Sequence, residues 1–248
     1  MRFNALVTVA GTIAGAIASV TGFGIGSLLT PIVGLQVSTK IAVAAVSVPH
    51  VIGTALRFWV MRERVDRHVL LTFGLTSAAG GLTGALLHEW ISSPWLTIVF
   101  GLLLLFVGVS ELVGLSKKMR FHGPLAWIAG ALSGLLGGLV GNQGGIRSAA
   151  LLGVDLPRQT FVATATAVGL IVDGARMPVY LVTSGREVLA IWPTVLMATV
   201  GVIMGTVFGS RLLRRIPEAR FRPILAVLLA ILGAAMLMNG IGALRSVT

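Results

Sequence analysis

The sequence predicts an all-α polytopic membrane protein made of two inverted-topology repeats. Each repeat is expected to begin with a glycine-broken or re-entrant first helix, followed by three transmembrane helices. The composition, the long uncharged segments and an internal duplication predict this fold. Of the 248 residues, 56% are apolar and only 11% are charged, whereas soluble proteins average about 25% charged residues. So few charges cannot cover a soluble surface, which excludes an ordinary soluble enzyme, a disordered chain and a basic DNA-binding domain.

Eight apolar segments follow one another along the chain, joined by short connections. A helix needs about 20 apolar residues to cross a bilayer, and the segments are about that long or longer. The strands of a membrane barrel would instead alternate polar and apolar residues over about 10 positions. The segments run roughly over residues 3–39, 41–60, 69–87, 95–113, 125–154, 160–183, 188–209 and 224–242.

Glycine clusters interrupt the first and fifth segments. They read TGFGIG over residues 21–26 and GGLVGNQGG over residues 137–145. Each glycine costs a helix interior about 1 kcal/mol relative to alanine. Both segments are therefore predicted to break, or to turn back inside the membrane. Close packing of helices through small residues is the alternative interpretation of these glycines.

The two halves of the chain are copies of each other. An offset of 119 residues matches Gly22 to Gly141 and Arg57 to Arg176. A duplication at a fixed spacing indicates a repeat architecture. The predicted divisions are a first membrane repeat over 1–115, a basic linker over 116–123 and a second membrane repeat over 124–248.

Lysine and arginine are concentrated in three loops, which predicts that these loops face the cytoplasm. Loops 61–68, 116–123 and 210–223 hold 3, 3 and 5 of the 19 basic residues.

Corresponding loops of the two halves carry opposite charge bias. Loop 61–68 is basic while its counterpart 183–187 holds only Arg186, and loop 88–94 has no basic residue while its counterpart 210–223 is rich in arginine. This swap indicates repeats of opposite orientation in a cell inner (cytoplasmic) membrane, with both termini outside. Eight simple crossings are the alternative.

The two breaks are the predicted binding site for a small anion. A broken helix exposes backbone N–H groups, and the positive end of a helix dipole attracts anions. In transporters built from inverted repeats, such breaks meet near the middle of the membrane. The predicted substrate-binding residues are Thr21, Gly22, Phe23, Gly24 and Gly26 in the first break and Gly141, Asn142, Gln143, Gly144 and Gly145 in the second.

Charged residues lie beside or after each break, inside apolar segments. Arg57, Arg147 and Arg176 are predicted to bind the anion, because arginine keeps its charge and can bind an oxyanion through two parallel hydrogen bonds. His50 and Asp173 are the predicted proton carriers, should transport be coupled to protons. As alternatives, Arg57 reaches the membrane interface and Arg147 anchors its helix. Similarly, Asp173 and Arg176 neutralise each other, and His50 is a hydrogen-bonded residue at a proline kink.

Other activities find no support in the sequence. It contains no HExxH, GxSxG, P-loop or paired-carboxylate motif, and no cysteine for disulfides, thiolate metal sites or nucleophiles. We therefore expect no catalysis, no cofactor and no metal site. The expected partners are a small anion and the lipid bilayer, and not nucleic acid, because most basic residues serve as topology signals. The glycine-rich helix faces would also suit a homodimer.

The two breaks, with their flanking residues, resemble the TauE/SafE family of membrane permeases, also called the sulfite exporter family. The resemblance lies in residues 15–31 (GAIASVTGFGIGSLLTP), in their copy 134–153 (GLLGGLVGNQGGIRSAALLG) and in the two-module layout. It covers essentially the whole chain. The usual break of the family reads nearer to Gly-x-Gly-Gly-Gly followed by proline, so Ile25 and the Asn142–Gln143 pair depart from it.

The resemblance implies transport of small sulfur-containing or organic anions, such as sulfite or sulfonates. We therefore expect a secondary transporter, operating as an exporter of a small sulfur-containing oxyanion. The anion would bind near the membrane midplane between the two breaks, with alternating access from the two sides. The alternatives are an anion channel, a permease for another small organic anion or a divalent metal cation, and a membrane protein without transport activity.

Overall fold

The computed structural model describes residues 2–115, 123–142, 144, 147–148, 151, 154, 156–209 and 218–246. Every regular element among these residues is a helix, and six of the described helices are long and apolar enough to cross a membrane. These findings confirm the predicted all-α polytopic membrane fold. The helices are α1 (Arg2–Thr21), α2 (Ile25–Val33), α3 (Thr39–Met61), η1 (Arg62–Arg64), α4 (Arg67–Trp90), α5 (Ser93–Leu112), α7 (Pro124–Val140), α9 (Arg158–Ala190), α10 (Trp192–Met204), the π-helix η2 (Gly205–Gly209) and α12 (Glu218–Arg245).

Glycine breaks the first helix of each half, as predicted. Gly22 at φ 82° and Gly24 at φ 127° separate α1 from α2. Gly141 at φ 74° follows the end of α7. Residues with a side chain rarely adopt such positive φ values, so glycine lets the chain leave both helices at these points.

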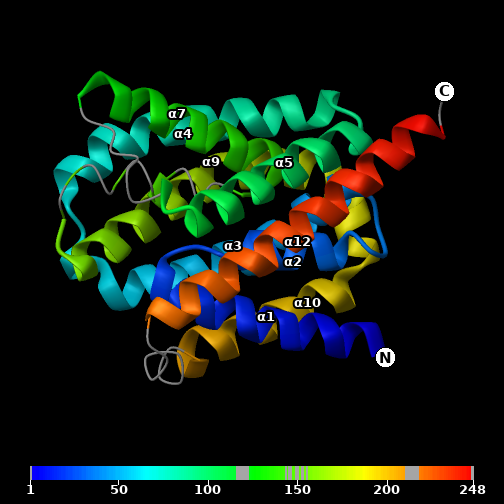
Figure 1. Cartoon of the computed structure of the whole chain (residues 1–248), viewed down its shortest axis with the longest axis horizontal. Coiled ribbons are helices and arrows are strands. Elements are labelled where there is room, and N and C mark those ends of the chain that lie inside the picture. The colour runs from blue at the N-terminus through cyan, green and yellow to red at the C-terminus, as the bar shows by residue number, and fades with distance from the viewer. Residues whose placement is uncertain are drawn as a thin grey trace.

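The short helix α2 lies inside the helical bundle. It packs against α1 and α3, and among its 9 residues only Ile32 is not fully buried. Figure 1 shows it at the centre of the molecule. The first break is therefore held in the interior of the protein, and not at one of its ends.

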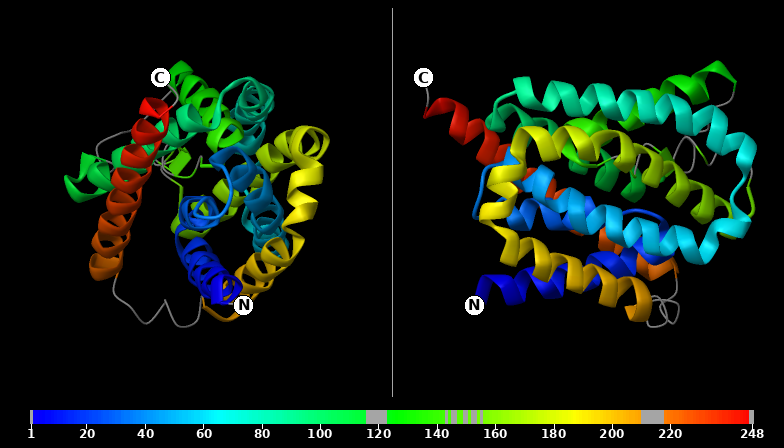
Figure 2. Two further views of the ribbon diagram at one scale, coloured as in Figure 1. Left: turned by 90° about the vertical axis from the view of Figure 1, so that its right-hand side faces the viewer. Right: turned by 180° about the vertical axis from the view of Figure 1, so that it is seen from behind.

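The helices of the two halves pair reciprocally. The first helix of each half packs along the third long helix of the other, because α1 lies against α10 and η2 while α7 lies against α4. The remaining helices pair with their own copies, α3 with α9 and α5 with α12. Both chain termini lie at the same end of the bundle in Figure 1 and in the right-hand view of Figure 2. The orientation of each half relative to a membrane stays a prediction.

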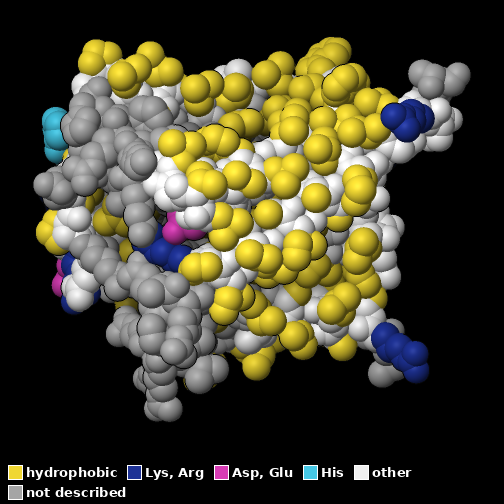
Figure 3. Space-filling view, viewed as in Figure 1, with side chains coloured by type: hydrophobic (Ala, Val, Ile, Leu, Met, Phe, Trp, Pro, Cys, Tyr) yellow, Lys and Arg dark blue, Asp and Glu magenta, His cyan; other side chains and the backbone are white. Residues whose placement is uncertain are grey.

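The outer surface of the bundle is apolar. Large apolar side chains are widely exposed on it, Trp90 and Val182 to 87%. Figure 3 shows apolar side chains over most of one face, with basic side chains at its right-hand ends. Soluble monomers rarely expose continuous apolar patches of this extent, so this surface suits contact with lipid.

One predicted boundary is wrong, because the expected loop over 183–187 is helical. Helix α9 runs for 33 residues to Ala190, without interruption. A single glycine costs a helix only about 1 kcal/mol, and Gly185 is too weak a breaker to end α9. The helix ends before Pro193, which stands in the first turn of α10. The connection that corresponds to loop 61–68 therefore lies at Ile191, between α9 and α10, and not at 183–187.

Glycines bring the paired helices into backbone contact. A Cβ atom on Gly80 of α4 would lie 2.9 Å from the backbone nitrogen of Leu135 on α7. In the other half, a Cβ on Gly11 of α1 would lie 2.8 Å from the carbonyl oxygen of Ala198 on α10. Packing through small residues therefore joins both helix pairs, as in many membrane proteins.

Substituting Gly80 by valine is expected to lower the melting temperature of the detergent-purified protein, because the added side chain must push α4 away from α7. Overpacking of this kind costs about 1–3 kcal/mol. The matched control is Gly174→Val on α9, where an added Cβ would meet no atom within 4 Å. Equal melting temperatures of the two variants would contradict the close approach of α4 and α7.

Candidate functional site

The two glycine breaks lie against each other. A Cβ on Gly26 of the first break would overlap the carbonyl oxygen of Gly141 in the second. In the same way, Gly144 of the second break leaves room for the side chain of Phe23 in the first. The structure thus brings together two segments that are far apart in the sequence, at the centre of the bundle.

The first break is shaped by a local turn. The Thr21 hydroxyl accepts a hydrogen bond from the Phe23 amide at 3.3 Å and lies 2.8 Å from the Phe23 carbonyl oxygen. Gly22 and Gly24 supply the positive φ values on either side of Phe23. Phe23 is therefore fixed between two glycines and directed at the second break.

The second break is held by side chains that bind the open end of α7. The last carbonyl groups of a helix have no partner within it. Here the carbonyls of residues 137, 138 and 139 accept hydrogen bonds from Arg176 Nη1 (2.7 Å), the Tyr180 hydroxyl and His88 Nδ1 (2.7 Å), in that order. The positive charge of Arg176 also suits the negative end of the helix dipole.

Sequence reasoning missed Tyr180 and His88. Tyr180 is the single tyrosine of the chain, and both side chains are almost completely buried, at 1% and 0% exposure. A polar aromatic residue inside an apolar segment was an available signal. Its partner could not be inferred, because the α7 carbonyls come close only after the two halves have packed.

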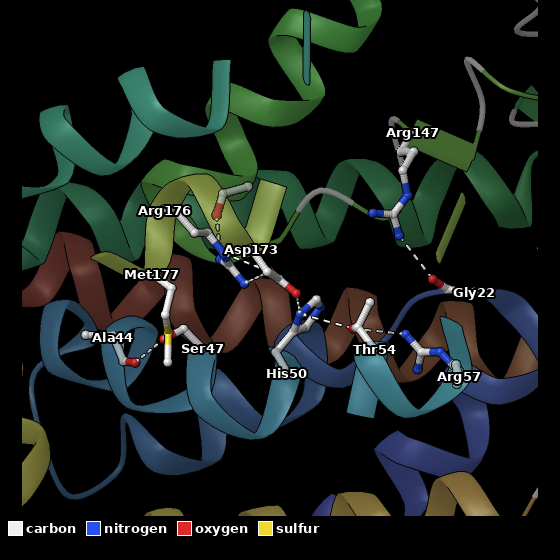
Figure 4. A network of polar contacts seen from close by, with 11 residues as sticks. Gly22, Ala44, Ser47, His50, Thr54, Arg57, Arg147, Asp173, Arg176 and Met177 are labelled. Carbon is white, nitrogen blue, oxygen red and sulfur yellow. Dashed lines mark hydrogen bonds and ion pairs between the residues drawn. The ribbon is translucent and has the colours of Figure 1, made fainter. Parts of the chain in front are cut away.

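Asp173 joins α9 to α3. Its Oδ1 atom accepts hydrogen bonds from Arg176 Nε at 3.0 Å and Nη2 at 2.8 Å. Its Oδ2 atom lies 2.7 Å from His50 Nδ1. Figure 4 shows Arg176 and His50 pointing at this carboxylate from opposite sides. Asp173 and Arg176 therefore neutralise each other's charge, and His50 has a hydrogen-bonding partner.

Arg57 and Arg147 have no carboxylate partner among the described residues. Arg57 Nη2 donates to the Thr54 hydroxyl at 3.2 Å, and Arg147 Nη2 donates to the Gly22 carbonyl at 3.0 Å. The Nε and Nη1 atoms of both arginines are buried without a hydrogen-bond partner in the described part of the chain. Both side chains lie inside the protein (Figure 4), with exposures of only 5% and 3%.

The remaining predicted site residues are placed as follows. Asn142 is buried beside the second break, and its Nδ2 atom has no partner among the described residues. Gln143 and Gly145 lie outside the described residues. Within the described ranges, no group of three or more histidine or acidic side chains is placed to hold a metal ion.

The described site carries an excess of positive charge and of hydrogen-bond donors. Three guanidinium groups, those of Arg57, Arg147 and Arg176, are buried, and the buried carboxylate of Asp173 is already bound by Arg176 and His50. A buried site of this kind can lower its energy by binding an anion.

A polytopic helical bundle in which two broken helices meet inside the protein is an architecture found in many membrane transporters. The family model of the sulfite exporter TauE/SafE family matches residues 7–236, so the chain belongs to this family. This result confirms the resemblance seen in the sequence. This family is one of membrane transporters of sulfur-containing anions. No curated protein and no solved structure matches the chain.

Proposed function

We propose that this protein is a secondary transporter that exports a small sulfur-containing oxyanion, such as sulfite or a sulfonate. One observation carries the proposal. The buried nitrogen atoms without a partner in the described residues are Nε and Nη1 of Arg57, Nε and Nη1 of Arg147, and Nδ2 of Asn142. All of them are donors, and an oxyanion offers only acceptors.

The burial of two unpaired arginines favours an anion that carries a full charge. A buried charge left without its partner costs a protein about 3–5 kcal/mol. An oxyanion bound to Arg57 and Arg147 would compensate both charges and accept charge-assisted hydrogen bonds from their Nε and Nη1 atoms, which have no partner among the described residues. Arg176 was also predicted as an anion ligand. Its nitrogens already bind Asp173 and the end of α7, so we assign it to holding the site together.

The proposed mechanism is alternating access by rocking of one half against the other. Contacts between the breaks, such as the bond from Arg147 to the Gly22 carbonyl, would be exchanged for contacts to the anion during the cycle. An inside-negative potential drives an anion outward by about 2.3 kcal/mol per charge per 100 mV, so export requires no coupling ion. For uptake, a proton would accompany the anion, and His50 with Asp173 is the proposed carrier.

We further propose an inner-membrane location with loops 61–68, 116–123 and 210–223 in the cytoplasm. The concentration of basic residues in these loops supports it. Two repeats of opposite orientation, over 1–115 and 124–248, agree with the reciprocal helix pairing of the structure. The glycine-rich helix faces that suggested a homodimer pack within the chain, as Gly11 and Gly80 do, so they give the proposed homodimer no support.

Purified protein in liposomes is expected to release labelled sulfite at a rate that saturates with concentration. Unlabelled sulfite on the opposite side should accelerate this release by exchange, because a carrier with bound substrate reorients across the membrane faster than an empty one. Protein-free liposomes are the control. An ohmic single-channel current would show that the protein is an anion channel and not a carrier. A lack of flux for sulfite, sulfonates and carboxylates alike would refute the proposal.

A further inference from the structure

The Arg147 guanidinium lies directly on the backbone of α9 at Gly169. A Cβ atom added to Gly169 would lie 2.8 Å from Nη1, 3.5 Å from Cζ and 3.7 Å from Nη2 of Arg147. Gly169 stands in the middle of a long helix, where glycine is unfavourable. It is not among the glycines with positive φ, so the backbone there does not require glycine. The space beside Gly169 is occupied by the guanidinium group, the far end of a flexible side chain, which an added Cβ atom would push aside.

The opposite side of the same guanidinium group faces the first break. Arg147 Nη2 donates to the carbonyl of Gly22 at 3.0 Å. Gly169 and Gly22 therefore fix the group from two sides, one in each half of the chain. Its Nε and Nη1 atoms stay buried without a partner among the described residues, and the side chain is 97% buried. These are the atoms that the proposed function assigns to the anion.

The two halves differ at this pair of positions in a complementary way. The offset of 119 residues matches Arg147 to Leu28 and Gly169 to His50. In the first half, α3 carries the large side chain of His50, and the neutral Leu28 follows the break. In the second half, α9 has only Gly169 at this position, and Arg147 follows the break. The guanidinium group of Arg147 occupies the space that a side chain at position 169 would fill.

We propose that Gly169 is the positioning residue for the anion ligand Arg147, and that it thereby sets the affinity of the site for the transported oxyanion. This inference rests on the proposed function. Any side chain at position 169 would push the guanidinium group away from the position in which it bonds to Gly22 and would bind the anion. The helix itself would not suffer, because alanine stabilises a helix interior relative to glycine.

The test compares Gly169→Ala with Gly174→Ala in the liposome assay with labelled sulfite. Both substitutions are made in α9, and an added Cβ at Gly174 would meet no atom within 4 Å. Gly169→Ala is expected to raise the KM for sulfite by about tenfold or more through weakened charge-assisted hydrogen bonds. The maximal rate and the melting temperature should change little, whereas Gly174→Ala should behave like the wild type.

A second pair of variants separates positioning from a general structural role. In an Arg147→Lys background, Gly169→Ala should change the KM by less than about twofold. The ammonium group of lysine is more compact than the planar guanidinium group and leaves room for the added methyl group. If Gly169→Ala alone fails to fold, Arg147→Lys should restore folding by removing the clash. An equal KM effect in both backgrounds, or no rescue of folding, would overturn the proposal.

The wild type, assayed in parallel, distinguishes a failure of the proposed transport function from a failure of the proposed role of Gly169. Absence of flux of sulfite, sulfonates and carboxylates alike from the wild type would refute the proposed function. Normal flux from the wild type, together with an unchanged KM in Gly169→Ala, would overturn only the role of Gly169.

Discussion

Glutamine in place of Arg57 or Arg147 is expected to reduce sulfite flux by about 100-fold or more while the protein stays folded. Each arginine would supply two charge-assisted hydrogen bonds to the anion, each worth about 1.5–3 kcal/mol, and 1.4 kcal/mol corresponds to a factor of ten. Both side chains are buried without a carboxylate among the described residues. Removing an unpaired buried charge also removes its desolvation cost.

The melting temperature of the anion-free variants should therefore equal or exceed that of the wild type. Arg176→Gln is the matched control, because it removes the same charge from a side chain that binds Asp173 and the α7 carbonyl of Gly137. That variant should melt at a lower temperature. Wild-type flux in both Arg57→Gln and Arg147→Gln, or a loss of stability as large as that of Arg176→Gln, would contradict the assignment of the two arginines.

Substitution of Asp173 by asparagine is expected to destabilise the protein by about 3–5 kcal/mol, the usual cost of removing one partner of a buried ion pair. The carboxylate is 1% exposed and receives Arg176 and His50 at 2.7–3.0 Å. Its removal leaves the Arg176 guanidinium group buried without a counter-charge. Thermal melting in detergent, with the yield of monodisperse protein, measures the loss.

Glu89→Gln serves as the comparison for Asp173→Asn. Glu89 pairs with Lys40 at 3.4 Å, but its side chain is 44% exposed. Because exposed pairs contribute only about 0–1 kcal/mol, this variant should melt close to the wild type. The double variant Asp173→Asn with Arg176→Gln should recover part of the lost stability, since no unpaired charge then remains. A melting temperature of Asp173→Asn equal to that of Glu89→Gln would show that the contacts of Asp173 with Arg176 and with His50 of α3 do not stabilise the fold.

Signals that are local in the chain predicted the all-α membrane fold and named the residues of the candidate site. The glycines at positions 22, 24 and 141 adopt backbone angles that other residues avoid, so the clusters marked the breaks directly. Arginine inside an apolar segment is costly wherever it lies, and this cost singled out Arg57 and Arg147 before their surroundings were known.

The features that sequence reasoning missed depend on contacts between distant segments. The roles of Tyr180 and His88 follow from the position of the end of α7 relative to α9 and α4. The function of Gly169 depends on the side chain of a residue in another segment. The course of α9 through 183–187 was missed because one glycine and a few polar residues resemble a loop, although a helix tolerates them.

The length of α9 has a mechanical consequence. A continuous helix of 33 residues measures about 50 Å at 1.5 Å per residue, whereas the hydrocarbon core of a bilayer is about 30 Å thick. The helix must therefore lean, bend or extend beyond the lipid. Pro178 lies between Arg176 and the distant end of the helix, and a proline inside a helix favours a kink. Movement of Asp173 and Arg176 at the binding site would therefore swing the segment after Pro178. A fluorescent label near residue 186 would report movements at the anion site from outside it.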